Sequence, residues 1–556
     1  MRPFISGSIA ALVLSALISA PSHAESSADL ATTPAAAAEP VDVGTTTVPA
    51  VSDAVAEAAE RADDDAADLV AQLPARRTGD FGLVGVTWER GFEAKGMTVQ
   101  VRLRTDGSWS DWEELHVESD EGEGGRDGTE PLWAGSADGV AVRVTSPTGE
   151  RPKGLSVATI DPGTTASSAS TVGADSGVST AFHSAAGDGA VTQVADGSPA
   201  YTGKPSIISR SGWGARKNTY CDSPRAGNET RGIVVHHTAG TNSYSKSQSP
   251  GIVRAVQAYH MKGRDWCDIG YNFLVDKYGQ IFEGRNGGTS VPVRGAHAGV
   301  KSVNTYTMGV SMMGTFSSSE PSSATKSAMV RLIGWRLGTT FHPATGTYKI
   351  GDRAFHRIAG HRNVVSTACP GAAAYAWLSK SGGLRDRVSA YVSGYTSSIK
   401  TRATFLGSAT TGPVFIGETI FTGGRKARLQ KLDLYASTAG TFSVANYFRT
   451  GYNALKAQSG ILGMPASEAE STAVAGVQVQ RFARGSIHRV FRNGRYASYA
   501  VWQGIDAKYR ELGEAAGELG RPTKTEASIS GGRFRAYFEH GYITRSSTGV
   551  ITVTMT

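Results

Sequence analysis

Two histidines and one cysteine have the types and the spacing of a catalytic zinc site. His236 directly follows the apolar run 233–235, so a buried strand would carry it to the edge of a sheet. His361 lies in the segment IAGHRNV, and Cys369 follows eight residues later in STACPG. Because Pro370 suits the first turn of a helix, Cys369 is expected at a helix N-terminus, where the dipole favours the thiolate that zinc requires. Three protein ligands and one open position are what a hydrolytic zinc site needs.

The same residues allow other interpretations. A single strand histidine is usually a satisfied core or surface residue, and a single cysteine usually packs. A cysteine at a helix N-terminus is also compatible with a cysteine peptidase, with Cys369 as nucleophile and His297 or His361 as base. The His-Arg-x₆-Cys spacing favours a metal, and chelation should stop a zinc enzyme but spare a thiol enzyme.

The N-terminal residues have the pattern of a secretory signal peptide. Arg2 supplies the positive charge, residues 5–18 form a short apolar stretch, and residues 21–24 end in small residues, so we assign residues 1–24 to a cleaved signal. The apolar stretch is too short to span a bilayer comfortably, and no second one follows. We therefore expect an exported protein with no transmembrane anchor. An odd count of three cysteines in such a protein suggests one disulfide and one metal-bound thiolate.

The charge of the chain suits a polyanionic partner. Lys and Arg number 56 against 49 Asp and Glu, which gives a formal net charge of +7. Nucleic acid is a poor candidate for an exported protein, whereas wall polymers that carry phosphate or carboxylate are a natural one. We expect a monomeric, wall-associated protein with no nucleic-acid partner.

With 556 residues the chain is too long for one compact core, and its composition changes along its length. An Ala-rich acidic stretch with almost no aromatic residues predicts a disordered spacer, and short β-branched runs between turn signals predict a small β-sandwich. A Ser/Ala/Gly linker then precedes the segment that carries the histidines and the cysteine. The predicted divisions are spacer 25–76, β-sandwich 77–162, linker 163–203, metal-site domain 205–398 and repeat region 400–556.

The C-terminal region repeats itself with a period of 57 residues. LGMP at 462–465 returns as LGRP at 519–522, and a weaker third trace surrounds Tyr435. After each clear copy come an aromatic residue, a glycine and an apolar residue: Phe482, Gly485 and Ile487, then Phe538, Gly541 and Ile543. Such periodicity predicts stacked units that bury shared faces. The units resemble LGFP repeats of wall-associated actinobacterial proteins, which implies binding to anionic wall polymers.

Strands alternate with helices in residues 205–398, which favours an α/β or α+β layer fold. RGIVVHH predicts a buried strand, and YNFLVDKYGQIFEGR predicts a hairpin that turns at Tyr278-Gly279. Three helices are predicted in SPGIVRAVQAYHM, SATKSAMVRLIGWRLGTTF and PGAAAYAWLSKSGGLRDRV.

Five motifs in this segment carry a family resemblance. They read ISRSGWGAR, GIVVHHTAGTN, RAVQAYHMKGRDWCDIGYNFLVDKYGQIFEGR, GAHAGVKSVNTYTMGVSMMGT and IAGHRNVVSTACPG. In this order they resemble the peptidoglycan recognition protein and type 2 amidase superfamily, which includes the phage lysozyme-type amidases. The resemblance implies a central mixed β-sheet flanked by helices, with Zn²⁺ at one end of a substrate groove.

The resemblance also assigns site residues. His236, His361 and Cys369 match the zinc ligands, and relatives that only bind peptidoglycan typically lack the cysteine. The tyrosine of Asp-Ile-Gly-Tyr, Tyr271, matches the catalytic tyrosine, and Thr367 takes a position that is often threonine in active recognition proteins. One departure is Asn363, where the family usually has aspartate.

The resemblance also implies residues of the substrate groove and a disulfide. Residues in motifs that face the groove in relatives are Trp213, His260, Arg285, His297 and Asn304. With Cys369 assigned to zinc, Cys221 and Cys267 are left to form a disulfide, which would contribute on the order of 3–4 kcal/mol by closing its loop.

The implied reaction is hydrolysis of the amide between the lactyl group of N-acetylmuramic acid and L-Ala. Zinc would lower the pKa of a bound water to about 7, and Tyr271 would stabilise the oxyanion with support from Thr367. No His-Glu-x-x-His motif is present, so spacing identifies no carboxylate base. A non-catalytic wall-binding protein is the alternative from a different class.

Overall fold

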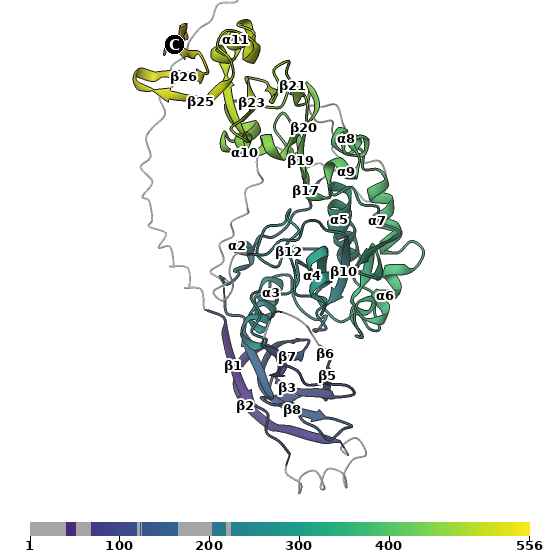
Figure 1. Cartoon of the computed structure of the whole chain (residues 1–556). Helices are drawn as coiled ribbons and strands as arrows, with labels where there is room; N and C mark the ends of the chain where they lie inside the picture. Colours follow the sequence, from purple (N-terminus) through teal and green to yellow (C-terminus); the bar gives the residue numbers. More distant parts are fainter. Residues whose placement is uncertain (1–39, 52–67, 119–122, 124, 165–202, 218–223) are drawn as a thin grey trace, which may run out of the picture.

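The computed structural model describes residues 40–51, 68–118, 123, 125–164, 203–217 and 224–556 (Figure 1). These residues form an N-terminal β-sheet domain, a central mixed α/β domain and three small antiparallel sheets toward the C-terminus. The predicted multidomain fold class is therefore confirmed. The predicted signal peptide lies outside the described residues. No helix in the described part of the chain is long and apolar enough to cross a membrane.

The N-terminal domain is a nine-stranded antiparallel sheet with the main order β1-β9-β2-β8-β3-β4. Alternate residues of its strands, such as Val99, Val101 and Leu103, point into a buried apolar core. Its strands are β1 (Asp42–Thr47), β2 (Leu69–Glu89), β3 (Thr98–Thr105), β4 (Ser108–Trp109), β5 (Glu113–Leu115), β6 (Val117–Glu118), β7 (Arg126–Thr129), β8 (Leu132–Thr145) and β9 (Ser156–Asp161).

This domain begins earlier than the sequence predicts. Strand β1 and the start of β2 lie within residues 25–76, which we expected to be a spacer. The residues of β1 are mostly polar, and they form a strand because their backbone pairs with β9 from Asp42↔Asp161 to Thr47↔Ser156. Amino-acid composition alone does not predict such backbone pairing.

The central domain is built on a five-stranded sheet with the order β12-β11-β13-β10-β16. Strand β10 runs parallel to both β13 and β16, while β11 and β12 form the predicted antiparallel hairpin. The strands are β10 (Gly232–His237), β11 (Phe273–Val275), β12 (Ile281–Glu283), β13 (Thr307–Met312) and β16 (Ile358–Gly360), with β14 (Thr347–Ile350) and β15 (Arg353–His356) in a separate pair. The sheet is mixed, as the resemblance implied.

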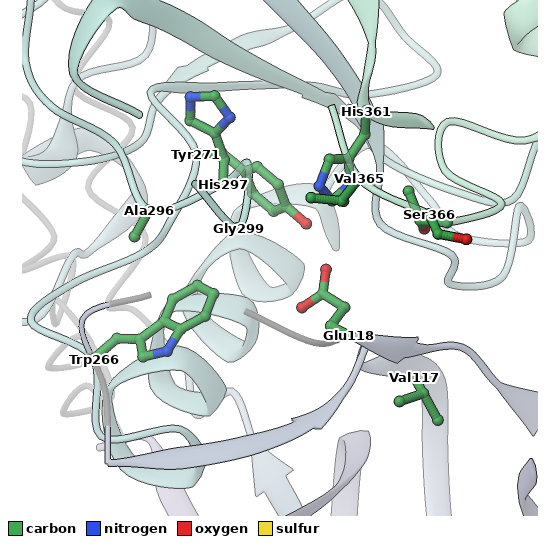
Figure 2. A pocket seen from close by; sticks show the side chains of 11 residues that line it. Val117, Glu118, Trp266, Tyr271, Ala296, His297, Gly299, His361, Val365 and Ser366 are labelled. Atoms are coloured by element: carbon green, nitrogen blue, oxygen red, sulfur yellow. The ribbon is translucent and has the colours of Figure 1, made fainter. Parts of the chain in front are cut away.

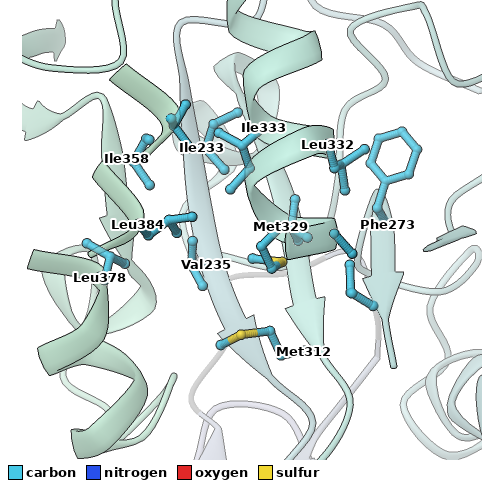
Figure 3. Packing of buried hydrophobic residues seen from close by; sticks show 14 of the residues in the cluster. Ile233, Val235, Phe273, Met312, Met329, Leu332, Ile333, Ile358, Leu378 and Leu384 are labelled. Atoms are coloured by element: carbon cyan, nitrogen blue, oxygen red, sulfur yellow. The ribbon is translucent and has the colours of Figure 1, made fainter. Parts of the chain in front are cut away.

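One face of this sheet is covered by helices and forms the main apolar core. Ile233 and Val235 of β10 pack with Met329 and Ile333 of one helix and with Leu384 of another (Figure 3). Because side chains alternate along a strand, Val234 and His236 point to the opposite face. The helices of the domain are α2 (Arg210–Trp213), α3 (Ser249–Ala258), α4 (Lys301–Tyr306), α5 (Ser323–Thr339), α6 (Ala372–Ser379) and α7 (Leu384–Ser393).

Two helix predictions need correction. The last predicted helix is two helices, α6 and α7, because the chain turns at Gly382 with φ 67°. A Cβ at Gly383 would lie 2.1 Å from the Trp377 carbonyl oxygen, so only glycine fits this turn. Helix α3 ends earlier than predicted and continues as a π-helical turn, η2 (Tyr259–Gly263).

The C-terminal region contains three four-stranded antiparallel sheets that follow helices α8 (Ser398–Leu406) and α9 (Ser408–Thr411). The two clear sequence repeats occupy equivalent places. Tyr452 donates a hydrogen bond to the carbonyl of Gly463 at 2.6 Å, and Tyr509 donates to Gly520 at 2.7 Å. The elements are β17 (Val414–Phe421), β18 (Gly424–Leu429), β19 (Leu432–Ser437), β20 (Gly440–Ala445), α10 (Asn446–Ala454), β21 (Glu470–Ser471), β22 (Val477–Phe482), β23 (Gly485–Arg492), β24 (Arg495–Trp502), α11 (Gln503–Glu511), β25 (Pro522–Ile529), β26 (Arg533–Phe538), β27 (Gly541–Arg545) and β28 (Ile551–Met555).

The N-terminal and central domains share an apolar cluster. Leu83, Trp133 and Ile160 of the β-sheet domain pack in one buried group with Val256 of α3 and with Tyr259. In Figure 1, α3 lies between the nine-stranded sheet of the N-terminal domain and the five-stranded sheet of the central domain. A continuous buried core across the boundary makes these two domains one packed unit.

Candidate metal centre

Two neighbouring parallel strands deliver the two histidines to one point. In the pairing of β10 with β16, Val235 lies opposite Gly360. The next residue of β10 is His236, and the residue that directly follows the end of β16 is His361. Both side chains are buried, and their ring centroids are 4.5 Å apart. The apolar run before His236 therefore positions it as predicted, at the end of a buried strand.

Cys369 reaches the same point from the loop between His361 and α6. Its Sγ lies 3.8 Å from His236 Nδ1, and its backbone N–H donates to Thr367 Oγ1 at 3.2 Å. The expected helix N-terminus is wrong, because α6 begins at Ala372, after Gly371 at φ 90°. The helix dipole is therefore not what would hold Cys369 as a thiolate.

The three side chains fit a zinc ion. Their ligand atoms all lie within 4.8 Å of one another. Tetrahedral zinc with the usual Zn–N and Zn–S lengths separates its ligand atoms by about 3.4–3.6 Å, so only small rotations are needed. Both ring nitrogens of His361 are buried and have no hydrogen-bond partner in the described residues. A buried polar group without a partner is costly, and a metal ion would satisfy it.

The protonation states also suit metal binding. Burial lowers the pKa of His361 to about 4, and burial together with the neighbouring histidines holds the pKa of His236 well below its usual range. Both imidazoles are therefore neutral and able to bind a metal at neutral pH. Burial and the nearby Glu130 raise the pKa of Cys369 well above that of a free thiol. A cation at the site would offset this and stabilise the thiolate.

A narrow pocket opens beside the candidate ligands (Figure 2). Tyr271, His297, His361 and Thr367 all line it, so the structure brings these predicted residues together. The ring of Tyr271 lies 5.3 Å from that of His236, and burial raises its pKa well above the usual value. The phenol therefore stays protonated and can donate a hydrogen bond into the pocket.

His297 contacts the candidate metal ligand His236 directly. Its Nδ1 lies 3.0 Å from His236 Nε2, which leaves Nδ1 of His236 facing Cys369. Asn304 accepts hydrogen bonds from the backbone N–H groups of His297 and Ala298 at 2.8 and 2.9 Å. His297 thus orients His236, and Asn304 fixes the segment that carries His297.

The other predicted groove residues do not line this pocket. Trp213 is fully buried and donates its Nε1–H to the carbonyl of Glu283 at 2.7 Å. His260 is also buried and stacks on Trp266, with 4.5 Å between ring centroids. The structure gives these two side chains packing contacts. Arg285 lines a different pocket and forms an ion pair with Glu123.

The structure also bears on Asn363 and on the predicted disulfide. Asn363, the departure from the family pattern, donates to Tyr375 Oη at 2.8 Å and accepts the Gly360 N–H at 2.9 Å, so it supports the turn after β16. Cys221 lies outside the described residues, and the disulfide with Cys267 stays a prediction.

Carboxylates of the N-terminal domain reach the same centre, and sequence reasoning missed them. Glu118 lines the pocket, while Glu130 lies 3.8 Å from His237 Nε2 behind Cys369. Burial and the neighbouring Glu118 raise the pKa of Glu130 well above its usual range. No local spacing could have identified these residues, because they come from another domain.

Known proteins resemble the two domains that form this centre. Residues 226–372 match the family model of N-acetylmuramoyl-L-alanine amidases, and residues 40–171 match a model described as Rv3811 N-terminal galactose-binding domain-like.

The similarity to individual proteins covers the central domain. The chain is 35% identical over 165 residues to peptidoglycan-recognition protein SC2 of Drosophila melanogaster, which is 30% of this chain and 80% of that protein. It is 34% identical over 166 residues to peptidoglycan recognition protein 1 of Bos taurus, which is 30% of this chain and 78% of that protein. The structure of Drosophila PGRP-LB matches with 29% identity and a TM-score of 0.27, over 32% of this chain and 93% of that one. Through its central domain the chain belongs to the family of peptidoglycan recognition proteins and amidases.

Proposed function

We propose that this chain is a zinc-dependent N-acetylmuramoyl-L-alanine amidase that acts on peptidoglycan. The main support is the buried triad of His236, His361 and Cys369, of which His361 lines one pocket together with the protonated Tyr271. The family match and the names of the relatives supply the substrate class.

The residues divide the work of amide hydrolysis. A bound Zn²⁺ would supply a Lewis acid for the scissile carbonyl and would make a water molecule more acidic. Tyr271 donates a hydrogen bond to the oxyanion that forms as water adds to the carbonyl carbon. His297 holds His236 in the orientation that presents Nδ1, and Thr367 fixes the backbone of Cys369.

The site supports this function better than a cysteine peptidase. A nucleophilic cysteine needs a lowered pKa, but burial and Glu130 raise the pKa of Cys369. Cys369 is also almost fully enclosed, and it is absent from the residues that line the pocket. A peptidoglycan-binding protein without catalysis would not need a buried triad with ligand spacing.

The deciding experiment measures release of stem peptides with N-terminal L-Ala from purified peptidoglycan. Wild type is compared with Cys369→Ala and with chelated protein before and after zinc is restored. We expect activity in the wild type, none in the variant or the chelated sample, and recovery with zinc. Cleavage that survives chelation would contradict the zinc mechanism, and wall binding without any released peptide would favour the recognition function.

We further propose that the protein is exported and held on the wall by its C-terminal sheets. Support comes from the N-terminal signal pattern and from the basic charge of residues 400–556, where Lys and Arg outnumber Asp and Glu by roughly two to one. Two of the sheets place an arginine over a tyrosine ring: Arg489 is 3.6 Å from the Tyr496 centroid, and Arg535 is 4.1 Å from that of Tyr542.

Such arginine and aromatic pairs suit an anionic polysaccharide. Replacing both arginines with alanine should lower binding to intact walls and leave hydrolysis of soluble muramyl peptides unchanged. Equal losses in the two assays would contradict a wall-binding role.

A further inference from the structure

The β6–β7 hairpin of the N-terminal domain forms one wall of the metal-site pocket. Val117 and Glu118 of β6 line the pocket together with Tyr271 and His361 of the central domain (Figure 2). The hairpin is fixed by side chains of the central domain that donate hydrogen bonds to its backbone. Tyr259 Oη donates to the carbonyl of Thr129 at 2.7 Å. This hydrogen bond anchors the wall to the central domain.

Glu118 is held so that its carboxylate faces the reaction site. Arg264 Nη1 lies 3.0 Å from Glu118 Oε2, and the arginine side chain is fully buried over the Trp266 ring at 4.8 Å. The side chain of Glu118 keeps 15% of its surface exposed. In Figure 2 its carboxylate points toward the Tyr271 hydroxyl and His361. It is the sole carboxylate among the described residues that line this pocket.

Amide hydrolysis needs a group that carries a proton from water to the leaving nitrogen. The other titratable residues of the pocket have other roles. His361 is a candidate ligand, Tyr271 stays protonated, and His297 is hydrogen-bonded to His236. Glu130 lies behind Cys369 and does not line the pocket.

From this placement we infer that Glu118, supplied by the N-terminal domain, is the acid–base residue of the amidase reaction. The inference rests on the proposed function. Glu118 accepts a proton as the oxygen of water bonds to the carbonyl carbon. The C–N bond then breaks, and Glu118 returns that proton to the nitrogen, which leaves as the amine of L-Ala while the muramyl lactyl group becomes a carboxylic acid. No oxidant or second reactant is needed.

The test compares full-length wild type with Glu118→Gln, which keeps the shape of the side chain and removes its basicity. General acid–base groups typically contribute about 10²–10⁴-fold, so kcat on a soluble muramyl peptide should fall by that factor. Glu114→Gln is the matched control, because Glu114 is an exposed residue of the same domain. Zinc content and binding to peptidoglycan should be unchanged in both variants, whereas the melting temperature should fall in Glu118→Gln alone, because that change removes the charge that pairs with the buried Arg264.

A second variant separates catalysis from a structural role. In Glu118→Ala the missing carboxylate leaves space in the pocket, and added formate should restore part of the rate. A merely structural ion pair with Arg264 would give no rescue of the rate by formate.

The outcomes separate this inference from the proposed function. If wild type cleaves the amide and Glu118→Gln is as fast, the role of Glu118 is refuted and the amidase function stands. If Glu118→Gln is faster, the hairpin obstructs the pocket and the inference is wrong. If zinc-loaded wild type does not cleave the amide, both proposals fail.

Discussion

Replacing Tyr271 with phenylalanine tests the electrostatic part of the mechanism most sharply. The ring would keep its neighbours, because its contacts with His236 and His260, at centroid distances of 5.3 and 5.7 Å, do not involve the hydroxyl. The change therefore removes one hydrogen-bond donor from a largely buried position. Any effect on the rate can be assigned to that donor.

The size of the effect follows from what such donors contribute. Loss of one preorganised donor to an oxyanion costs about 10²–10³ in kcat, or about 2.7–4 kcal/mol. Because the hydrogen bond strengthens as the oxyanion forms, kcat and kcat/KM should fall by the same factor, with KM nearly unchanged. Burial raises the pKa of Tyr271, so ionisation of this phenol should cause no loss of wild-type activity near pH 9.

The assay is steady-state hydrolysis of a soluble muramyl peptide, with zinc content measured on the same samples. Tyr244→Phe is the control, because it removes another hydroxyl of this domain. That hydroxyl does not line the pocket and donates to the Met313 carbonyl at 3.1 Å. The reasoning is refuted if Tyr271→Phe raises KM with kcat intact, or if it loses zinc. Either result would show that Tyr271 acts in binding or in metal retention.

Three further predictions test the ligand, the domain boundary and the response to acid. Cys369→Ser should weaken zinc binding by more than about 100-fold, the upper range for changes outside the ligand set, as measured by competition with a chelator. Gly85→Ala should destabilise the protein by about 1–3 kcal/mol in urea unfolding, because its Cβ would lie 2.4 Å from the Tyr259 ring, whereas Gly79→Ala on the same strand meets nothing within 4 Å and should be neutral. Burial lowers the pKa of His488 to about 4, so the unfolded chain binds more protons between pH 6.5 and 4 and stability falls as the pH falls. Between pH 7 and 4 the wild type should lose up to about 3 kcal/mol of stability through His488, and His488→Gln should abolish this loss. An unchanged pH slope in the variant would contradict this.

The sequence predicts those parts of the site that depend on one element and its neighbours in the chain. An apolar run that ends in a histidine places His236 at the end of a buried strand, and the observed pairing of Val235 with Gly360 explains why His361 meets it. Neither the strand order nor this register can be read from residue spacing. The family motifs supplied what spacing did not.

The failed predictions have physical causes of the same kind. Strand β1 forms from polar residues because its backbone pairs with that of β9, and amino-acid composition carries no information about this pairing. The break between α6 and α7 depends on the close approach of Gly383 to the Trp377 carbonyl. Likewise, no property of Glu118 in the sequence distinguishes it from other acidic residues nearby. Each of these features depends on contacts between residues that are distant in the chain.

The placement of Glu118 shows that two domains build the pocket beside the candidate metal centre. Domains joined by polar surfaces usually move relative to one another, but a shared apolar core prevents this. Here Leu83, Trp133 and Ile160 are buried against the central domain, so the wall that carries Glu118 cannot swing away without exposing them. The two family matches therefore describe parts of one pocket, and the central domain alone would lack the carboxylate and expose α3. The N-terminal domain is better understood as one wall of the pocket than as an accessory module.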